Sequence, residues 1–481
     1  MALMFAVSLP LLAAFLCWLP PLRRMAWVIT IVILALTLSA ACVTAWQVLL
    51  NGRFIAIAGW FEADGLSALL LVMVTFVCIV AAIYSGGYMQ HETESKERLW
   101  WFYSNYNLFV FSLVAVPSLA RVNLVWVAVE LVTLFATLLV GYESTPGALE
   151  AAWKMAILTI MGAPISLFGF LTLYWAFRTS GGGTAETWQS LYVMASTMSP
   201  NLLKLSFLLV FVGFGAKSGL APMHTWLPDA HSQAPTPICA VLSGMKTTIP
   251  LYAVLRLLSI VLRSPEARIG EWMVIVGLFS VGIAAFLLLQ VRDYKRMFAY
   301  STVEHMGIIL TATGFATHAA AYGAVAQMLN HSITKSLCFY AAGMVLLALE
   351  TRDISQVRGL FRISPFAGGA LLLCSLAIAG APPFPIFLSE FSILSAGLRS
   401  GHSAAVIILA VLIVIAFIAI FLQVNSMLFG EPSHVATPAL APRSCRTAVL
   451  IAVAPVLLLG VYIPGPVHSL MTLAAQQLGG H

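Results

Sequence analysis

The sequence predicts an all-α protein, a polytopic membrane bundle of about 14 transmembrane helices. Of its 481 residues, 61% are apolar and 9% are charged, whereas soluble globular proteins carry about 45–50% apolar and about 25% charged residues. The apolar residues form continuous runs of about 20 residues, long enough for a helix to cross a bilayer and unlike the alternating segments of a membrane β-barrel. This composition excludes a soluble enzyme, a disordered tail and a nucleic-acid-binding protein.

The expected spans follow one another with short polar connections. They lie near residues 2–20, 25–50, 63–89, 100–119, 122–142, 149–177, 202–226, 236–262, 270–290, 297–316, 319–349, 366–398, 403–429 and 447–470. The longest connections, Arg178–Asn201 and Glu431–Arg446, are too short for a soluble domain, so we expect a single membrane domain over 1–481. Arg23 and Arg24 follow the first apolar stretch and no basic residue precedes it, which favours a retained span over a cleaved signal peptide.

Basic residues in the connections set the expected orientation, because cytoplasmic loops are enriched in Lys and Arg. One side receives Arg23, Arg24, Lys96, Arg98, Arg292, Lys295, Arg296, Arg352, Arg358, Arg362, Arg443 and Arg446. The other side receives Arg53, Arg121, Arg178, Arg263, Arg268 and Arg399. We expect the larger set in the cytoplasm of a bacterial or archaeal cell with this chain in its (inner) membrane. Both termini are then outside if the number of spans is even.

Ionisable residues stand inside several expected spans, where each costs about 2.5–3.5 kcal/mol if it faces lipid. They are Glu130, Lys154, Lys217, Lys246, Arg256, Glu304, His305, His331, Lys335 and Glu390. Lys154 and Arg256 lie near span ends, where a long side chain can reach the interface, and Glu304 with His305 can form a local structural pair. The others are flanked by apolar turns. As a set they indicate a buried proton relay, because a desolvated lysine can release its proton and an arginine cannot.

Two expected spans contain prolines beside an ionisable residue. Pro222 follows Lys217, and Pro382 and Pro383 precede Glu390. Proline interrupts a helix, and the freed backbone groups need protein or water at membrane depth. The broken spans are an odd number of spans apart, five, so the sequence predicts two inverted five-helix repeats. The expected divisions are 1–119 for the N-terminal helices, 100–262 for repeat one (opened by the fourth helix), 270–429 for repeat two and 447–481 for the C-terminal helix.

Four segments carry a resemblance to a known family. They are VWVAVELVTLFATLLV around Glu130, ALEAAWKMAILTIMG around Lys154, GFGAKSGLAPMHTWLPDAHSQAPTPICAVLSG over 213–244, and LNHSITKSLCFYAAG around His331 and Lys335. The chain resembles the antiporter-like membrane subunits of respiratory complex I, Mrp-type sodium/proton antiporters and membrane-bound group 4 nickel–iron hydrogenases. The resemblance covers about residues 60–430, and the EAAWK and HTWLPDAHSQAPTP wording is most similar to the F-type subunit of hydrogenase-4-like complexes.

The resemblance implies roles for the ionisable residues. Glu130 and Lys217 would form an ion pair whose opening and closing gates proton uptake. His331 and Lys335, four residues apart and therefore on one helix face, would lie in a central hydrophilic axis. Glu390 would be the outlet.

Two parts of this correspondence stay open. His224, Asp229 and His231 follow the first break and either line the inlet or cap freed backbone groups. The family commonly places Lys or Asn five residues after the Ser of its eighth helix, which is Thr248 here, but Lys246 stands two positions earlier. Two residues correspond to about 200° around a helix, so Lys246 faces elsewhere unless that helix is irregular.

The expected function is proton translocation by a membrane subunit of a redox-driven complex of the hydrogenase or NADH dehydrogenase type. We expect no cofactor, metal or redox site of its own, because the seven cysteines form no CxxC pair or metal spacing. Its expected partners are other membrane-arm subunits and, through them, peripheral iron–sulfur, hydrogenase or dehydrogenase subunits. The alternatives are a subunit of an Mrp-type Na⁺/H⁺ antiporter, a stand-alone solute carrier, and a scaffold with an inactive channel.

Overall fold

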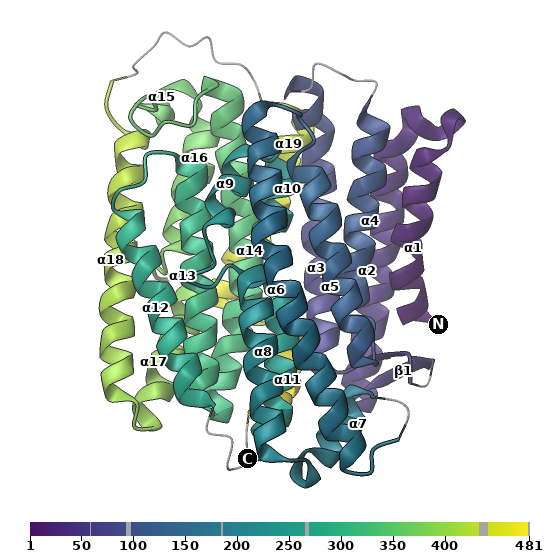
Figure 1. Ribbon diagram of the computed structural model, residues 1–481. Helices are drawn as coiled ribbons and strands as arrows, with labels where there is room; N and C mark the ends of the chain where they lie inside the picture. Colours follow the sequence, from purple (N-terminus) through teal and green to yellow (C-terminus); the bar gives the residue numbers. More distant parts are fainter. Residues whose placement is uncertain (58, 93–97, 184–185, 265–268, 432–440, 480–481) are drawn as a thin grey trace.

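The computed structural model describes residues 1–57, 59–92, 98–183, 186–264, 269–431 and 441–479. Figure 1 shows the helices side by side along one direction, with both chain ends toward the lower end of the bundle. The helices are α1 (Ala2–Trp18), α2 (Ala26–Asn51), α3 (Gly65–Glu92), α4 (Leu99–Ser118), α5 (Val122–Val140), α6 (Pro146–Thr179), α7 (Trp188–Met194), α8 (Pro200–Ser218), α9 (Trp226–Gln233), α10 (Thr236–Val241), α11 (Thr248–Val261), α12 (Gly270–Leu288), α13 (Tyr294–Gly314), α14 (His318–Leu349), α15 (Leu360–Ile363), α16 (Pro365–Ile378), α17 (Pro385–Arg399), α18 (Ser403–Leu428), α19 (Arg443–Val461) and α20 (Gly465–Leu478). The tighter turns η1 (Pro20–Met25) and η3 (Ala195–Thr197) and the π-helical segment η4 (Leu242–Lys246) complete the helical part.

The expected all-α membrane fold is confirmed. Within the described residues, ten helical segments are long and apolar enough to cross a bilayer. The four expected spans outside this set correspond to α1, α4, α13 and the α16–α17 pair. Of these, α1 and α16 are apolar but short, while α4 and α13 carry polar side chains such as Asn107 and Glu304. The exact number of spans therefore stays a prediction.

The lower end of the bundle carries the small non-helical part. Strands β1 (Phe54–Ile57) and β2 (Phe61–Ala63) form an antiparallel hairpin in which Phe54 pairs with Ala63. The long connection Arg178–Asn201 contains the short helix α7, where Thr187 and Ser190 form a capping box. That signal was readable as Thr-x-x-Ser, although it lacks the usual Glu or Gln.

Two helices are interrupted, as the prolines predict. Helix α8 ends at Gly219, whose φ of +75° suits a helix C-terminus, and α9 continues after a turn. Helix α16 is followed by Gly380, with φ of +78°, and then by α17. In Figure 1, α8 lies below α9, whereas α16 lies above α17, so the broken helices run in opposite directions. This is the arrangement that inverted repeats require.

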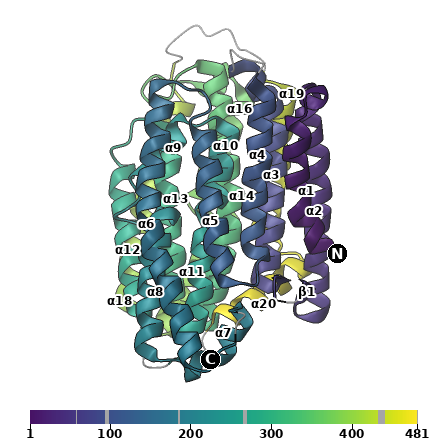
Figure 2. The same ribbon diagram turned by 45° about the vertical axis from the view of Figure 1, so that its right-hand side comes forward.

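The polar residues lie on the most buried helices. The segment from α10 through η4 to α11 is buried along its whole length, whereas α18 exposes large apolar side chains such as Ile407 and Val411. Helix α14 packs against helices from both halves, including α3, α10, α13, α16 and α17, and Figure 2 shows it within the bundle. Its buried polar side chains therefore lie in the protein interior instead of facing lipid.

Members of the two basic sets lie at opposite ends of the bundle. Helix α15, which carries Arg362, lies at the upper end of Figure 1, and β1, which follows Arg53, lies at the lower end. Lys96 and Arg268 lie outside the described residues. Which end faces the cytoplasm remains a proposal.

Candidate functional site

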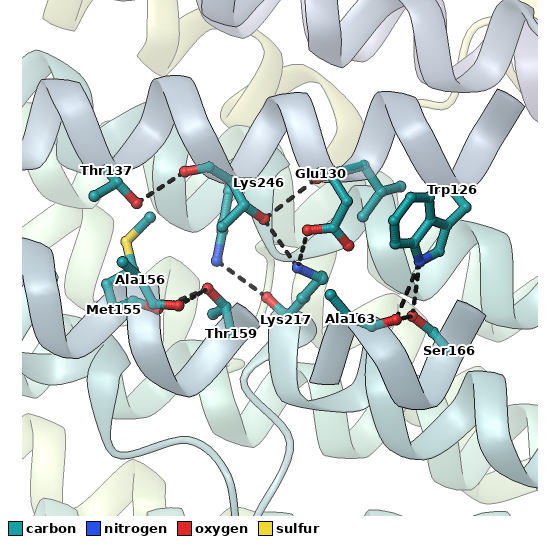
Figure 3. Close-up of polar contacts among 12 residues, drawn as sticks. Trp126, Glu130, Thr137, Met155, Ala156, Thr159, Ala163, Ser166, Lys217 and Lys246 are labelled. Carbon is teal, nitrogen blue, oxygen red and sulfur yellow. Dashed lines mark hydrogen bonds and ion pairs between the residues drawn. The ribbon is translucent and has the colours of Figure 1, made fainter. Parts of the chain in front are cut away.

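The structure brings Glu130 and Lys217 together at the first break (Figure 3). The Lys217 Nζ lies 3.0 Å from the Glu130 Oε2 and donates to the Thr133 hydroxyl at 3.3 Å. Lys217 is fully buried, while the Glu130 side chain is 22% exposed. Lys217 also stands in the last turn of α8, where the negative end of the helix dipole stabilises a cation. This buried charge is thus supported by its partner, a hydroxyl and its own helix.

The helix that carries Lys246 is irregular. Residues Leu242–Lys246 form the π-helical segment η4 between α10 and α11. Pro250, four residues after Lys246, has no N–H for the Lys246 carbonyl, and its ring crowds that carbonyl. Wider π turns are the usual response to such a disturbance and are frequent at functional sites. The helix is thus irregular at Lys246, which is the condition under which Lys246 could share the face expected for the family's lysine.

Lys246 points back to the end of α8. Its Nζ donates to the Lys217 carbonyl at 3.3 Å and lies 3.5 Å from the centre of the Trp226 ring. Trp226 in turn donates its indole N–H to the Ala216 carbonyl at 2.9 Å. Two carbonyls freed by the break are thus satisfied by side chains that follow it, and the two lysines share one polar site.

Helix α14 continues the polar contacts toward α13. The Nε2 of His331 lies 3.4 Å from the Ser243 carbonyl of η4, and its ring centre is 5.0 Å from that of His305. His305 contacts the Gln327 amide nitrogen through Nδ1 at 2.8 Å and the Ile378 carbonyl through Nε2 at 3.1 Å. The histidine pair therefore connects η4 with the end of α16.

Lys335, one turn along α14 from His331, is held by α13. Its ammonium donates to the Phe298 carbonyl at 3.0 Å and to the Ser301 hydroxyl. Glu304 on the same helix is buried, and its Oε2 has no hydrogen-bond partner among the described residues. The base and the acid thus lie on adjacent helices with the carboxylate free to accept a proton.

Glu390 lies on the second turn of α17 and is 6% exposed. A Cβ at Gly380 would meet its Oε2 and force the carboxylate to shift, and the positive φ of Gly380 itself favours glycine. The adjacent Ser389 donates to the Gln327 amide oxygen, and Asn330 donates to the Pro385 carbonyl at 2.8 Å. Buried polar side chains of η4, α14 and α13 therefore lie between the first break and the second.

Asp229 on α9 forms ion pairs and does not cap the break. Its Oδ2 lies 3.2 Å from the Lys154 Nζ on α6, and its Oδ1 lies 2.9 Å from the Arg296 guanidinium on α13. Lys154 also contacts Glu150 at 2.6 Å and is 35% exposed, in agreement with its expected place near a span end. Asp229 therefore joins α6, α9 and α13 near the upper end of the bundle.

The two histidines of the same motif are buried. His231 donates its Nδ1–H to the Leu227 carbonyl at 2.7 Å, and its Nε2 has no partner among the described residues. The Nδ1 of His224 is likewise unpaired there. One ring nitrogen of His231 is thus held by its own helix, and the other has no partner among the described residues.

The sequence predicted loops at Lys295 and Arg352 and did not predict their contacts with the end of α9. Two polar cavities of about 540 and 390 Å³ flank the stretch Ser232–Ala234. Lys295 is almost fully buried there and donates to the Ala234 carbonyl at 3.0 Å, and Arg352 donates to the Ser232 carbonyl at 2.5 Å. Lys295 and Arg352 both belong to the basic set expected in cytoplasmic loops, and nothing in their spacing indicated these contacts.

The expectation that Arg256 reaches the interface is wrong. Its side chain is 11% exposed and pairs with Asp64 at 2.5 Å. The partner lies at the start of α3, and its distance along the chain hid the pair from the sequence.

Two known protein families match this chain. The family described as "NADH:quinone oxidoreductase/Mrp antiporter, TM" matches residues 120–416, and "NADH-Ubiquinone oxidoreductase (complex I), chain 5 N-terminus" matches residues 55–98. The chain belongs to this family of antiporter-like membrane subunits. The matched range contains all the ionisable residues singled out above, from Glu130 to Glu390.

Curated relatives place the chain within that family. It is 37% identical to the hydrogenase-4 component F homolog of Methylacidiphilum infernorum, over 84% of this chain and 86% of the relative. It is 30% identical to hydrogenase-4 component B of Escherichia coli and 32% identical to the chloroplastic NAD(P)H-quinone oxidoreductase subunit 5 of Ipomoea purpurea. Those matches cover 68% and 73% of this chain, but the chain spans about half the length of either relative. The resemblance to an F-type subunit is confirmed.

Solved structures show the same fold. A chain of the archaeal membrane-bound sulfane sulfur reductase superposes with a TM-score of 0.88 at 23% identity, covering 99% of this chain and 97% of that one. A chain of the Mrp complex from a Dietzia species gives 0.86 at 19% identity with the same coverage. The names of these relatives and neighbours describe components, subunits or complexes.

Proposed function

We propose that this chain moves protons across the membrane as a subunit of a redox-driven complex. The supporting observation is the buried Lys217–Glu130 pair at the broken end of α8, with Lys246 on the Lys217 carbonyl. Attraction between unit charges about 4 Å apart is of order 4 kcal/mol at an effective dielectric near 20. Separating the pair therefore changes the readiness of Lys217 to release its proton by several powers of ten.

Glu130 is the point at which a neighbour acts. Its side chain is the more exposed of the two, at 22%, on a helix whose residues Val127 and Leu134 are exposed. A membrane-arm partner that displaces its carboxylate releases the proton of Lys217 toward Lys246. The proton then passes through the His331–Lys335 region of α14 to His305, Gln327 and Ser389, and leaves at Glu390.

The finer assignments belong to the same proposal. Repeat one (100–262) holds the lysine pair, and repeat two (270–429) holds the outlet. The upper end of Figure 1 faces the cytoplasm, so that both termini are outside. The cavities beside Ser232–Ala234 admit protons to His231, with Lys154, His224, Asp229, Glu304 and His305 in supporting roles. Redox chemistry on hydrogen, formate or NADH takes place in peripheral partners.

The decisive experiment replaces Lys217 by alanine in the intact complex and reconstitutes it in vesicles. Redox-driven acidification should be lost while assembly persists. Lys204, a partly exposed lysine at the other end of α8, gives the matched control, and Lys204→Ala should pump as the wild type does. Undiminished pumping by an assembled Lys217→Ala complex would reject the proposal.

Sodium/proton exchange is the alternative, because the matching family includes Mrp antiporters. It predicts that a sodium gradient drives proton movement without a redox substrate. Acidification that depends on redox turnover and ignores the sodium gradient supports the main proposal, and the opposite pattern supports the alternative.

A further inference from the structure

We infer that Arg256 is a proton barrier that prevents the lysines of the first break from leaking protons directly to the lower end of the molecule. The inference rests on the proposed function, since a barrier matters only where protons move. It assigns a role to a buried ion pair that lies off the route to Glu390.

A polar line leads downward from Lys246. Thr248, Tyr252 and Arg256 recur every four residues and therefore share one face of α11. Thr248 and Tyr252 are fully buried and carry hydroxyls. Lys246 and Arg256 are ten residues apart, about 15 Å along a helix. Two buried hydroxyls, those of Thr248 and Tyr252, thus lie on α11 between the lysine site and Arg256.

This line ends at a polar pocket. The pocket has a volume of about 220 Å³ and lies between β2, α3, α7, α11 and α20. Its lining includes Glu62, Asp64, Gln477 and Arg256. In Figure 1, α7 and β1 mark the end of the bundle where it lies. Without an obstacle, a proton on Lys246 would have a shorter way out here than through the second repeat.

Arg256 stands at the junction of the line and the pocket. Its Nε donates to the Tyr252 hydroxyl at 3.0 Å, and its Nη2 donates to the Ser67 hydroxyl at 2.7 Å and pairs with the Asp64 Oδ2 at 2.5 Å. The two hydroxyl oxygens lie 3.0 Å apart. The guanidinium is therefore fixed from three directions and touches each hydroxyl through which a proton would have to pass.

The remaining surroundings leave its charge in place. Glu62 on β2 is the other carboxylate that acts on Arg256. Helix α7 contributes the Trp188 ring, whose centre is 5.6 Å from the guanidinium carbon, and α20 contributes the amide of Gln477 to the pocket. Two acids and an aromatic face keep the arginine cationic.

The chemistry of guanidinium makes this arrangement a barrier. A proton moves along hydrogen-bonded groups only if each group can accept one before giving one up. Guanidinium has five donors and no acceptor, and it is not deprotonated in proteins. Tyr252 and Ser67 each accept a bond from this cation, and its fixed positive charge disfavours an excess proton on either oxygen. A lysine at this position would block protons less well, because a desolvated ammonium can lose its proton.

Passive proton permeability tests the inference. Vesicles with the intact complex and a trapped pH dye receive an external pH step without redox substrate, and potassium with valinomycin holds the potential at zero. Arg256→Gln should raise the leak about tenfold or more over wild type, because glutamine can both accept and donate. Adding Tyr252→Phe to Arg256→Gln should return the leak to the wild-type rate, because the line is cut above the barrier.

Two controls separate the barrier from a general loss of charge or packing. Arg263 lies beyond the end of α11 with its guanidinium 4.3 Å from the Tyr192 ring centre, and Arg263→Gln should not leak. Asp64→Asn keeps the guanidinium on Tyr252 and Ser67, so it should not leak either. A wild-type leak in an assembled Arg256→Gln complex would overturn the inference, as would a leak of equal size in Arg263→Gln.

A second variant covers the case in which Arg256→Gln does not assemble. Arg256→Lys should leak more as the pH rises, whereas the wild-type leak should stay level. A level, wild-type leak in Arg256→Lys would also overturn the inference. These measurements need no pumping, so failure of the barrier is distinct from failure of the proposed function, which Lys217→Ala reports under redox turnover.

Discussion

The two broken helices place opposite charges in different surroundings. At the first break, Lys217 ends α8 with Glu130, Thr133 and the helix dipole supporting its charge. At the second, Glu390 lies one turn inside α17, beyond the first turn where the dipole acts most strongly. Among the described residues no basic side chain forms an ion pair with Glu390. The first break thus stabilises the charge of Lys217 with an ion pair, whereas the second places a carboxyl group, Glu390, without an ion-pair partner.

This difference suits opposite ends of one route. A tightly held charge needs an outside event to release it, which fits a gated start where Glu130 is partly exposed to a neighbour. The Glu390 carboxylate, with the neutral Gln327 amide as its hydrogen-bond partner, can take up and release a proton without breaking an ion pair. The comparison teaches that the two repeats share an architecture but not a charge pattern, and each prediction below tests one side of it.

The largest effect is expected from Glu130→Gln. It leaves the Lys217 ammonium buried without its anion, and removing one partner of a buried pair costs about 3–5 kcal/mol. Redox-driven pumping in vesicles should fall by at least about tenfold. Glu150→Gln is the matched control, because Glu150 is 56% exposed and pairs only at the surface. An assembled Glu130→Gln complex with more than half the normal rate would remove the distinction between the two breaks.

Two variants of Lys246 distinguish a structural role at the first break from a role in proton conduction. Lys246→Met removes the donor to the Lys217 carbonyl, which costs about 1–3 kcal/mol, so both the melting temperature and the pumping rate should fall. Lys246→Arg keeps a cationic donor that cannot release a proton. It should restore the melting temperature without restoring pumping, and restored pumping would show that Lys246 only supports the helix end.

At the second break, Glu390→Gln should slow pumping severalfold and leave the ratio of protons moved to redox turnover unchanged. Gly380→Ala should act in the same direction, because its Cβ meets the Glu390 carboxylate at a positive φ. Proton flux and substrate consumption are measured together across pH. Glu431→Gln, at an exposed acid after α18, provides the control. Normal rates at every pH would exclude Glu390 as the outlet.

The sequence predicted the elements of these sites better than their contacts. Apolar run length and the prolines near Lys217 and Glu390 were enough for the fold and the two breaks. The resemblance implied the Glu130–Lys217 pair, whose members are 87 residues apart. The pairing of Arg256 with Asp64 and the burial of Lys295 depend on how distant helices dock, which no local spacing encodes. Pro250 could have indicated an irregular turn before α11, but it could not have indicated the direction in which the Lys246 side chain points.

A smaller effect is expected at Asp229, which joins the two halves near the upper end. Its partners Lys154 and Arg296 are 35% and 41% exposed, and such ion pairs contribute about 0–1 kcal/mol each. Asp229→Asn should change pumping by less than about twofold and lower the melting temperature slightly at low salt, with the difference shrinking at high salt. A tenfold loss of pumping would instead place Asp229 in the proton route.

The smallest effect on pumping is expected from a buried acid far from both breaks. Glu186, between α6 and α7, is buried with its Oε1 unpaired among the described residues, and burial raises its pKa to about 7. The unfolded value is about 4.3. Between these values the folded chain holds a proton that the unfolded chain has lost, so stability falls as pH rises through this window and levels off above about pH 7.

Glu186→Gln cannot ionise and should lack that decline. Its free energy of unfolding should therefore gain on that of the wild type between about pH 4 and 7, by up to about 4 kcal/mol, and its melting temperature should rise accordingly while its pumping rate stays normal. Parallel melting profiles would show that Glu186 does not titrate in this window. A loss of pumping as large as that of Glu130→Gln would mean that burial of an acid, and not its place at a helix break, determines which carboxylates this protein needs.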